Sequence, residues 1–267
     1  MLDDEMRHEP ATPSLGVCLS RRHLRGWRDQ AAPWLHVELA IEEGMGPEDL
    51  LPGVEVGSLG GYRLFPASWS IWDEPEHDLR QNWRALHEKL CDDRVSYVVF
   101  GSGTFRSSRR GYGAVKTRAR LAALLSMMLE TSQDSEIDVY LEPLKPSECN
   151  VINSLRDALD VIEHLAPDGK DARRLGVVAD VNHIWEELQT DSSFAGQSRA
   201  VRVVHLSAPD SRRLPSQALL DPLAGLVHRL APGHVTFECE WTSAADFHQA
   251  WDYGARLLSR MKELRAG

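Results

Sequence analysis

The stretch IDVYLEPLKPSECNVINSLRDALDVIEHL (residues 137–165) shows the unit from which the chain is built. It opens with a short β-rich run and continues, after a polar connection, into a segment in which Leu155, Leu159 and Ile162 share one helical stripe. The next β-rich run, LGVVAD, follows at residues 175–180. A strand, a helix and a further strand in this order are typical of parallel βα units.

The same alternation extends outward over the whole chain. Helical patterns occur at 113–130, 154–165 and 243–263, and the last two open with a serine followed three residues later by an aspartate, a variant of the capping box. Several strand candidates are continuous apolar runs, as expected when both faces of a parallel sheet are covered. The eight candidates are 15–20 (LGVCLS), 34–41 (WLHVELAI), 62–71 (YRLFPASWSI), 96–101 (SYVVFG), 137–142 (IDVYLE), 175–180 (LGVVAD), 201–206 (VRVVHL) and 234–239 (HVTFEC).

Eight such units in a chain of 267 residues match the size of one closed barrel. A doubly wound open sheet would also accommodate the alternation, but neither GxGxxG nor GxxxxGK[ST] follows the first strand. We therefore predict the α/β class and a single (β/α)8 TIM barrel over residues 1–267, with residues 1–13 as a flexible N-terminal segment. The Gly-, Pro- and Glu-rich stretch 42–61 is interpreted as a short helix and a loop over the barrel mouth.

The composition argues against several classes of partner. The formal net charge is −10 and no lysine- or arginine-rich face is evident, so we do not expect nucleic acid as a partner. No run approaches the roughly 18 apolar residues of a membrane span, and we expect a cytoplasmic protein. The sequence leaves open whether the chain forms a homo-oligomer. Four cysteines without CxxC spacing are interpreted as reduced thiols: Cys18, Cys91, Cys149 and Cys239.

Polar residues close four consecutive strand candidates: Glu142, Asp180, His205 and Glu238. The carboxyl ends of barrel strands meet at one mouth, and in the last strand the parity shared by Thr236 and Glu238 points into the barrel. Three carboxylates beside an imidazole would be costly to bury without compensation. We predict that the four residues bind one divalent metal ion. This oxygen-rich set favours Mn²⁺, Mg²⁺ or Co²⁺ and tolerates Zn²⁺.

Four stretches also carry recognisable motifs. They are EPLKPSECNVIN (142–153), DVNHIWEE (180–187), VHLSAPDSRRLPSQALLD (204–221) and TFE (236–238). These motifs resemble those of the sugar phosphate isomerase and epimerase family with the xylose isomerase-like barrel, which includes ketose 3-epimerases, hydroxypyruvate isomerase and inosose dehydratase. The resemblance covers residues 96–240 well and the first strands only by general pattern.

The resemblance implies roles for individual residues. It implies the same four metal ligands that the strand ends suggest, and it adds Glu148, His183 and Arg212 as substrate-binding residues. Pro209 inserts one residue after the histidine of the third motif, and the spacing to Pro215 favours Arg212 as the family's arginine.

The activity implied is that of a metal-dependent isomerase or epimerase acting on a sugar or a related hydroxy-carbonyl compound. Removal of a carbon-bound proton gives an enediolate, which a divalent ion stabilises. Glu142 and Glu238 are the expected catalytic pair, one removing the proton and the other returning it. His183 and Arg212 are expected to orient the substrate oxygens.

Three alternatives remain open at this stage. A dehydratase of a keto-cyclitol or sugar acid would begin with the same proton removal. An abasic-site endonuclease would need additional histidines on the third and fourth strands and a DxH pair after the seventh, which the sequence lacks. A noncatalytic barrel protein is the third alternative, although all four ligand positions are retained.

Two further residues each receive a pair of alternative interpretations. Glu38, at the end of the second strand candidate, is either a substrate contact or an exposed or hydrogen-bonded strand-end acid. Arg106, just after the fourth, either binds a phosphate or carboxylate or is solvated.

Overall fold

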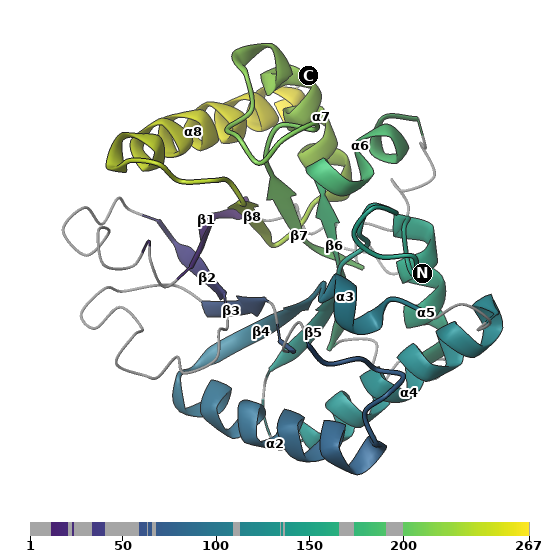
Figure 1. The fold of residues 1–267 in the computed structure, drawn as a ribbon. Helices are drawn as coiled ribbons and strands as arrows, with labels where there is room; N and C mark the ends of the chain where they lie inside the picture. Colours follow the sequence, from purple (N-terminus) through teal and green to yellow (C-terminus); the bar gives the residue numbers. More distant parts are fainter. Residues whose placement is uncertain are drawn as a thin grey trace, which may run out of the picture.

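Eight parallel strands form the centre of the molecule. The computed structural model describes residues 12–20, 23, 34–40, 59–62, 64–65, 68–108, 113–133, 135, 137–165, 174–190 and 200–266. Within these residues the strands pair in sequence order, and β1 pairs with β8 to close the barrel (Figure 1). The strands are β1 Ser14–Leu19, β2 His36–Ala40, β3 Leu59–Tyr62, β4 Val95–Phe100, β5 Asp138–Leu141, β6 Leu175–Asp180, β7 Val201–Leu206 and β8 His234–Phe237.

Seven of the eight strand predictions overlap their strands closely, and the third is wrong. It was expected at residues 62–71, whereas β3 spans Leu59–Tyr62 and pairs with β2 and β4. The sequence LGGY holds two glycines, which lack the side chains that mark a strand pattern. Ile71, at the far end of the predicted range, instead donates its N–H to the carbonyl of Phe105 outside the sheet. Of the predicted loop 42–61, residues 59–61 belong to β3 and the rest lies outside the described residues.

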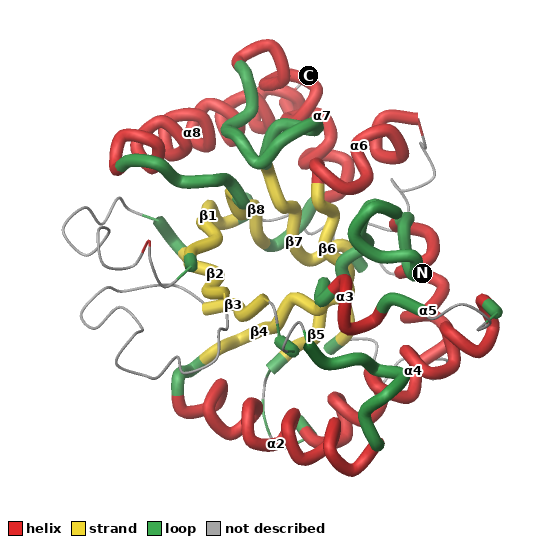
Figure 2. Tube along the Cα trace, viewed as in Figure 1, coloured by secondary structure: helices red, strands yellow, loops and turns green. Residues whose placement is uncertain are grey.

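The described helices surround the ring of strands, as Figures 1 and 2 show. All three predicted helices are confirmed, as α4, α5 and α8. The helices expected after β1 and β2 lie outside the described residues, so the complete eightfold repeat stays a prediction. The helices are α2 Glu76–Asp92, α3 Gly103–Arg106, α4 Ala114–Thr131, α5 Leu155–Leu165, α6 Val181–Thr190, a 3₁₀ turn Gln217–Leu219, α7 Leu220–Leu230 and α8 Ala244–Ala266.

Side chains alternate along each strand, so that one set packs inside the barrel and the other packs outward against the helices. On β8, Phe237 faces outward, where its ring packs edge-on against Tyr253 of α8. Thr236, its neighbour, is fully buried and bonds Glu38 of β2 inside the barrel. The barrel interior also holds an apolar cluster formed by Tyr97, Val99, Tyr140, Val178 and Val203. The barrel is therefore filled by side chains, and a site can form only where the strands end.

The predicted caps begin two of the helices. Ser154 Oγ accepts the N–H of Asp157 at 3.0 Å at the start of α5. Before α8, Asp246 Oδ2 accepts the N–H groups of Thr242 and Ser243 at 2.7 and 2.8 Å. The slight burial of Asp246 acts to raise its pKa, but these hydrogen bonds lower it overall. Both helices thus begin where their sequences place them.

The four cysteines are free thiols, as expected. Among the described residues, no helix has both the length and the apolar character that a bilayer span requires.

Candidate metal centre

The four predicted ligands converge at the carboxyl ends of β5 to β8. Glu142 directly follows β5, Asp180 ends β6, His205 lies in β7 beside Asp180, and Glu238 directly follows β8. Each contributes a donor atom, and these atoms all lie within 4.8 Å of one another. Strand order and interior parity together account for this convergence, because the residues sit on adjacent strands and point the same way.

His205 lies at the centre of the group and is 1% exposed. Its Nδ1 atom is 3.4 Å from Glu142 Oε1 and 3.2 Å from Glu238 Oε2 but forms no hydrogen bond of acceptable geometry. Burial acts to lower the pKa of His205, yet the charge of Glu38 and the surrounding carboxylates raise it well above its ordinary value. A buried nitrogen without a hydrogen bond, beside two carboxylate oxygens, is an atom that a metal ion would satisfy.

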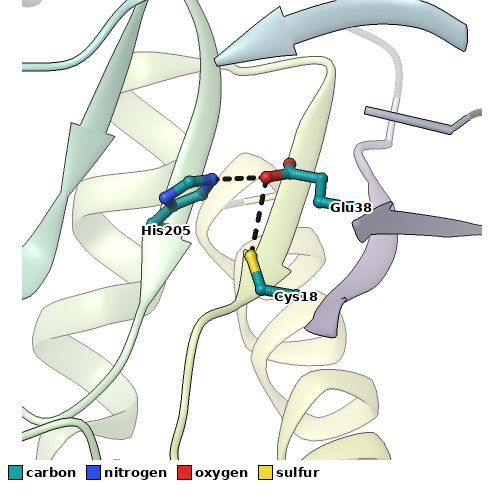
Figure 3. Close-up of side chains that lie close together, drawn as sticks. All are labelled: Cys18, Glu38 and His205. Carbon is teal, nitrogen blue, oxygen red and sulfur yellow. Dashed lines mark hydrogen bonds and ion pairs between the residues drawn. The ribbon is translucent and has the colours of Figure 1, made fainter. Parts of the chain in front are cut away.

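Glu38 of β2 holds the other nitrogen of this imidazole. His205 Nε2 is 2.8 Å from Glu38 Oε2, and Figure 3 shows this contact together with Cys18. Tyr97 and Thr236 donate to Glu38 Oε1 at 2.6 and 2.8 Å. Burial acts to raise the pKa of Glu38, but the charge and hydrogen bond of His205, with His36 and Tyr97, lower it to about 2. Glu38 is fully buried and hydrogen-bonded, so it is not an exposed strand-end acid, whereas its hydrogen-bonded interpretation is confirmed.

Arg212 neutralises part of the site. Its Nη1 donates to Asp180 Oδ2 at 2.7 Å and to Glu238 Oε2 at 2.6 Å, and its Nη2 lies 2.9 Å from His183 Nε2. Burial acts to lower the pKa of Arg212, but the charges of Asp180, Glu238 and Glu142 raise it overall. The guanidinium thus bridges two of the predicted ligands, and it lies within the site rather than apart from it.

The remaining predicted substrate residues lie beside this arginine. The His183 side chain is 1% exposed, and its Nε2 is 3.3 Å from Asp180 Oδ2. Glu148 is nearer the surface, with its Oε2 3.9 Å from His183 Nε2 and its Oε1 3.0 Å from Lys145 Nζ. The seven predicted site residues therefore form one continuous group. Glu148 is its most exposed acid, with 42% of the side chain accessible.

Two residues that support Glu142 were not predicted in this role. Gly101 directly follows β4, and a Cβ there would lie 2.3 Å from Glu142 Oε2, so only glycine leaves room for the carboxylate. Arg106 is 1% exposed and donates to the carbonyls of Phe100 and Glu142 at 3.3 and 2.5 Å. Its burial contradicts the solvated interpretation, and two of its guanidinium nitrogens donate to backbone carbonyls.

Two groups of side chains have donor atoms with metal-like spacing, and the group of four predicted ligands suits an ion better. Cys18, Glu38 and His205 form a second group with metal-like spacing. Burial and the charge of Glu38 raise the pKa of the Cys18 thiol, which donates to Glu38 Oε2 at 3.5 Å. Both Glu38 oxygens are thus already hydrogen-bonded by the protein. The group around Glu142, Asp180 and Glu238 keeps the unbonded Nδ1 atom and offers mostly oxygen, which suits Mn²⁺, Mg²⁺ or Co²⁺ and accepts Zn²⁺.

Comparisons with known proteins agree with this geometry. A family model described as "Xylose isomerase-like TIM barrel" matches residues 60–261. No curated protein matches the chain.

Solved structures of similar fold include several sugar epimerases. A structure of L-ribulose 3-epimerase is similar with a TM-score of 0.75 and 14% identity, covering 95% of this chain and 97% of that one. The 3-keto-D-glucoside 4-epimerase YcjR from E. coli gives a TM-score of 0.63 and 16% identity over 92% of this chain and 99% of its own. The IOLI protein with a bound zinc atom gives 0.66 and 11% over 93% and 99%.

Proposed function

The chain belongs to the xylose isomerase-like TIM barrel family, and from this premise we propose that it is a divalent-metal-dependent isomerase or epimerase of a sugar or related hydroxy-carbonyl compound. The observation that carries the proposal is the convergence of Glu142, Asp180, His205 and Glu238, whose donor atoms lie within 4.8 Å of one another. We also propose that the eightfold βα repeat is complete. The expected helices after β1 and β2 would cover strands that already close the barrel.

Named functions of the similar structures support this choice. Those reported above include two sugar epimerases and one protein that binds zinc. The low identities show only a shared fold, so the argument for activity rests on the side chains of this chain.

Glu142 and Glu238 are the proposed proton-transfer residues. Their carboxylates approach the same imidazole nitrogen from β5 and β8, so a substrate carbon between them would have an acid or base on each side. A bound divalent ion would polarise the substrate carbonyl and stabilise the negative charge that develops on it. In epimerisation one glutamate takes the carbon-bound proton, and the other, protonated, supplies a proton to the opposite face. The substrate is neither oxidised nor reduced.

The other residues would orient the substrate. Arg212 forms ion pairs with Asp180 and Glu238, and it would be free to bind a substrate oxygen once their charge is otherwise compensated. His183 is held beside Arg212, and Glu148 lies at the exposed side of both. Charged donors and acceptors at fixed positions suit a polyhydroxylated ligand, whose hydroxyl groups both donate and accept.

Exchange with solvent deuterium tests the activity directly. The purified chain, loaded with Mn²⁺ or Co²⁺, is incubated in D₂O with a panel of ketoses, aldoses and cyclitols and followed by NMR. We expect deuterium to enter a carbon beside the carbonyl without loss of water. Loss of water would make the chain a dehydratase instead. The absence of exchange with every class of substrate would contradict the proposal.

Replacing Glu238 tests the assigned pair. Glu238→Gln keeps the shape of the side chain but removes the acid, so turnover should fall by about 10²–10⁴-fold, while the circular dichroism spectrum stays unchanged. Glu240→Gln is the matched control, because Glu240 is exposed two residues further along. Comparable activity in the Glu238 variant and the control would reject the assignment.

A further inference from the structure

A hydrogen-bonded chain crosses the interior of the barrel and ends on Glu38. Thr236 Oγ1 donates to Glu38 Oε1 at 2.8 Å and also lies 2.7 Å from His36 Nε2. His36 Nδ1 lies 3.0 Å from Ser14 Oγ, which in turn lies 2.7 Å from His234 Nδ1. His234 opens β8, whereas His205 is the penultimate residue of β7, so the chain runs from the amino end of the barrel toward the metal centre.

The chemistry of these groups gives the hydrogen-bonded chain one direction. A hydroxyl has a single hydrogen, and that of Thr236 is donated to Glu38, so His36 must carry its proton on Nε2. The Nδ1 atom of neutral His36 is then a lone pair, which accepts the Ser14 hydroxyl. Ser14 has no second hydrogen to give, so His234 must donate from its Nδ1. Each proton therefore points toward Glu38.

The sequence makes room for this arrangement. His36 is fully buried inside the barrel. A Cβ on Gly16 of β1 would lie 2.1 Å from His36 Nε2, so only glycine at that position lets the imidazole reach Thr236. On the remaining sides of the carboxylate, Tyr97 donates to Oε1, and Cys18 and His205 approach Oε2. All donors converge on one buried acceptor, and its orientation is fixed from several strands.

We propose that Glu38 is the positioning residue of the metal centre: it accepts the Nε2–H of His205 and thereby presents the bare Nδ1 atom of this imidazole to the ion. The hydrogen-bonded chain that starts at His234 holds the Glu38 carboxylate in place for this role. The inference rests on the proposed function, since it assumes that the ion binds at Nδ1. A histidine ligand whose other ring nitrogen is fixed by a carboxylate is better oriented and more basic.

Metal affinity separates this role from a merely structural one. Competition with a chelator, for Mn²⁺ and Zn²⁺ on the full chain, measures the affinity of the wild type, Glu38→Gln and Tyr97→Phe. Tyr97→Phe is the matched control, because it removes a donor from the same carboxylate without touching the oxygen that holds His205. We expect Glu38→Gln to weaken binding by about 10–100-fold and Tyr97→Phe by less than about tenfold. Equal affinities for the wild type and Glu38→Gln would overturn the proposal.

The number of bound ions and the histidine tautomers are measured on the wild-type protein. These measurements therefore do not depend on whether a variant with a buried substitution folds. Long-range ¹H–¹⁵N spectra of the Zn²⁺-loaded chain should show His205 and His36 protonated on Nε2 and His234 protonated on Nδ1, with one ion bound. A His205 proton on Nδ1 in the loaded protein, or a second ion at Cys18 and Glu38, would refute the role of Glu38 alone. A wild-type chain that binds no divalent ion would refute the proposed function and this role with it.

Discussion

Glu38 and His205 are buried neighbours that differ in how fully their polar atoms are hydrogen-bonded. Both oxygens of Glu38 accept hydrogen bonds from protein donors, whereas the nearby His205 Nδ1 has none. A buried nitrogen without a hydrogen bond gains much from a cation. Within the His205 imidazole, hydrogen bonding therefore distinguishes the nitrogen that would bind the ion from the nitrogen that Glu38 orients.

His36 should make stability depend on pH. Burial lowers the pKa of His36 to about 3, the charge of Glu38 acts against this, and the neighbouring His234 and His205 add to it. In the unfolded chain this histidine takes up a proton below pH 6.5, its ordinary value, whereas in the folded chain it stays neutral. The unfolded state then binds more protons, so the free energy of unfolding should fall as the pH falls from 6.5 toward 3.

The measurement compares urea unfolding of the wild type and His36→Gln at pH 6 and pH 5. The free energy of unfolding should fall more steeply with falling pH in the wild type than in the variant. The difference should approach about 1.4 kcal/mol per pH unit. The introduced glutamine amide can still donate to Thr236 but does not titrate, and Glu38 and His205 are present in both chains. Identical slopes would show that His36 is not held neutral.

Sequence reasoning found the acids at the strand ends but not their supports. Glu142, Asp180, His205 and Glu238 could be predicted because each lies at or next to the end of a strand that is itself recognisable from its apolar residues. The partner of His205 is 167 positions away, and no local pattern encodes a contact between β2 and β7. The only signal was the parity of His36 and Glu38 in LHVELA, two polar residues facing the same side of an otherwise apolar run.

The Asp246 cap sets where α8 begins. Asp246 Oδ2 accepts three hydrogen bonds from Thr242 and Ser243 and satisfies N–H groups before the first turn. Asp246→Ala should lower the free energy of unfolding by about 1 kcal/mol, as measured in urea, with no change in metal affinity. Asp252→Ala, at an exposed position within the same helix, is the control and should leave stability nearly unchanged. Equal losses in the two variants would mean that the cap contributes nothing specific.

Elements with strong side-chain patterns could be predicted, and β3 could not. The apolar stripe of α5 and the capping residue at its start mark the helix, and the run LGVVAD defines β6. β3 is held by backbone pairing to β2 and β4, including Gly60 and Gly61, and glycine contributes no pattern to read. The misplaced strand did not affect the site, because all four predicted ligands lie on β5 to β8.

Closure of the barrel brings together site residues that are spread over nearly a hundred sequence positions. Neighbouring strands hold Asp180 beside His205 and His205 beside Thr236 at fixed register. The interior below them is filled by Tyr97, Tyr140 and their apolar neighbours. The ligands therefore meet at a rigid rim, and Arg212 offsets part of their charge. The ligands come together only when these strands pair, so the ion should bind only the folded chain.

Metal binding should consequently stabilise the whole molecule, because an ion held by Glu142, Asp180, His205 and Glu238 connects four strands that separate on unfolding. At a free Mn²⁺ concentration of about 100 times the dissociation constant, the gain is about 2.7 kcal/mol, or roughly 5–10 °C in the midpoint of thermal unfolding. Differential scanning fluorimetry with and without Mn²⁺ measures this shift, and EDTA should reverse it. Glu142→Gln removes one ligand and should reduce the shift at the same Mn²⁺ concentration, whereas Glu148→Gln, at the exposed side of the site, should retain it. A shift of the same size in the Glu142 variant and the wild type would show that the ion binds elsewhere.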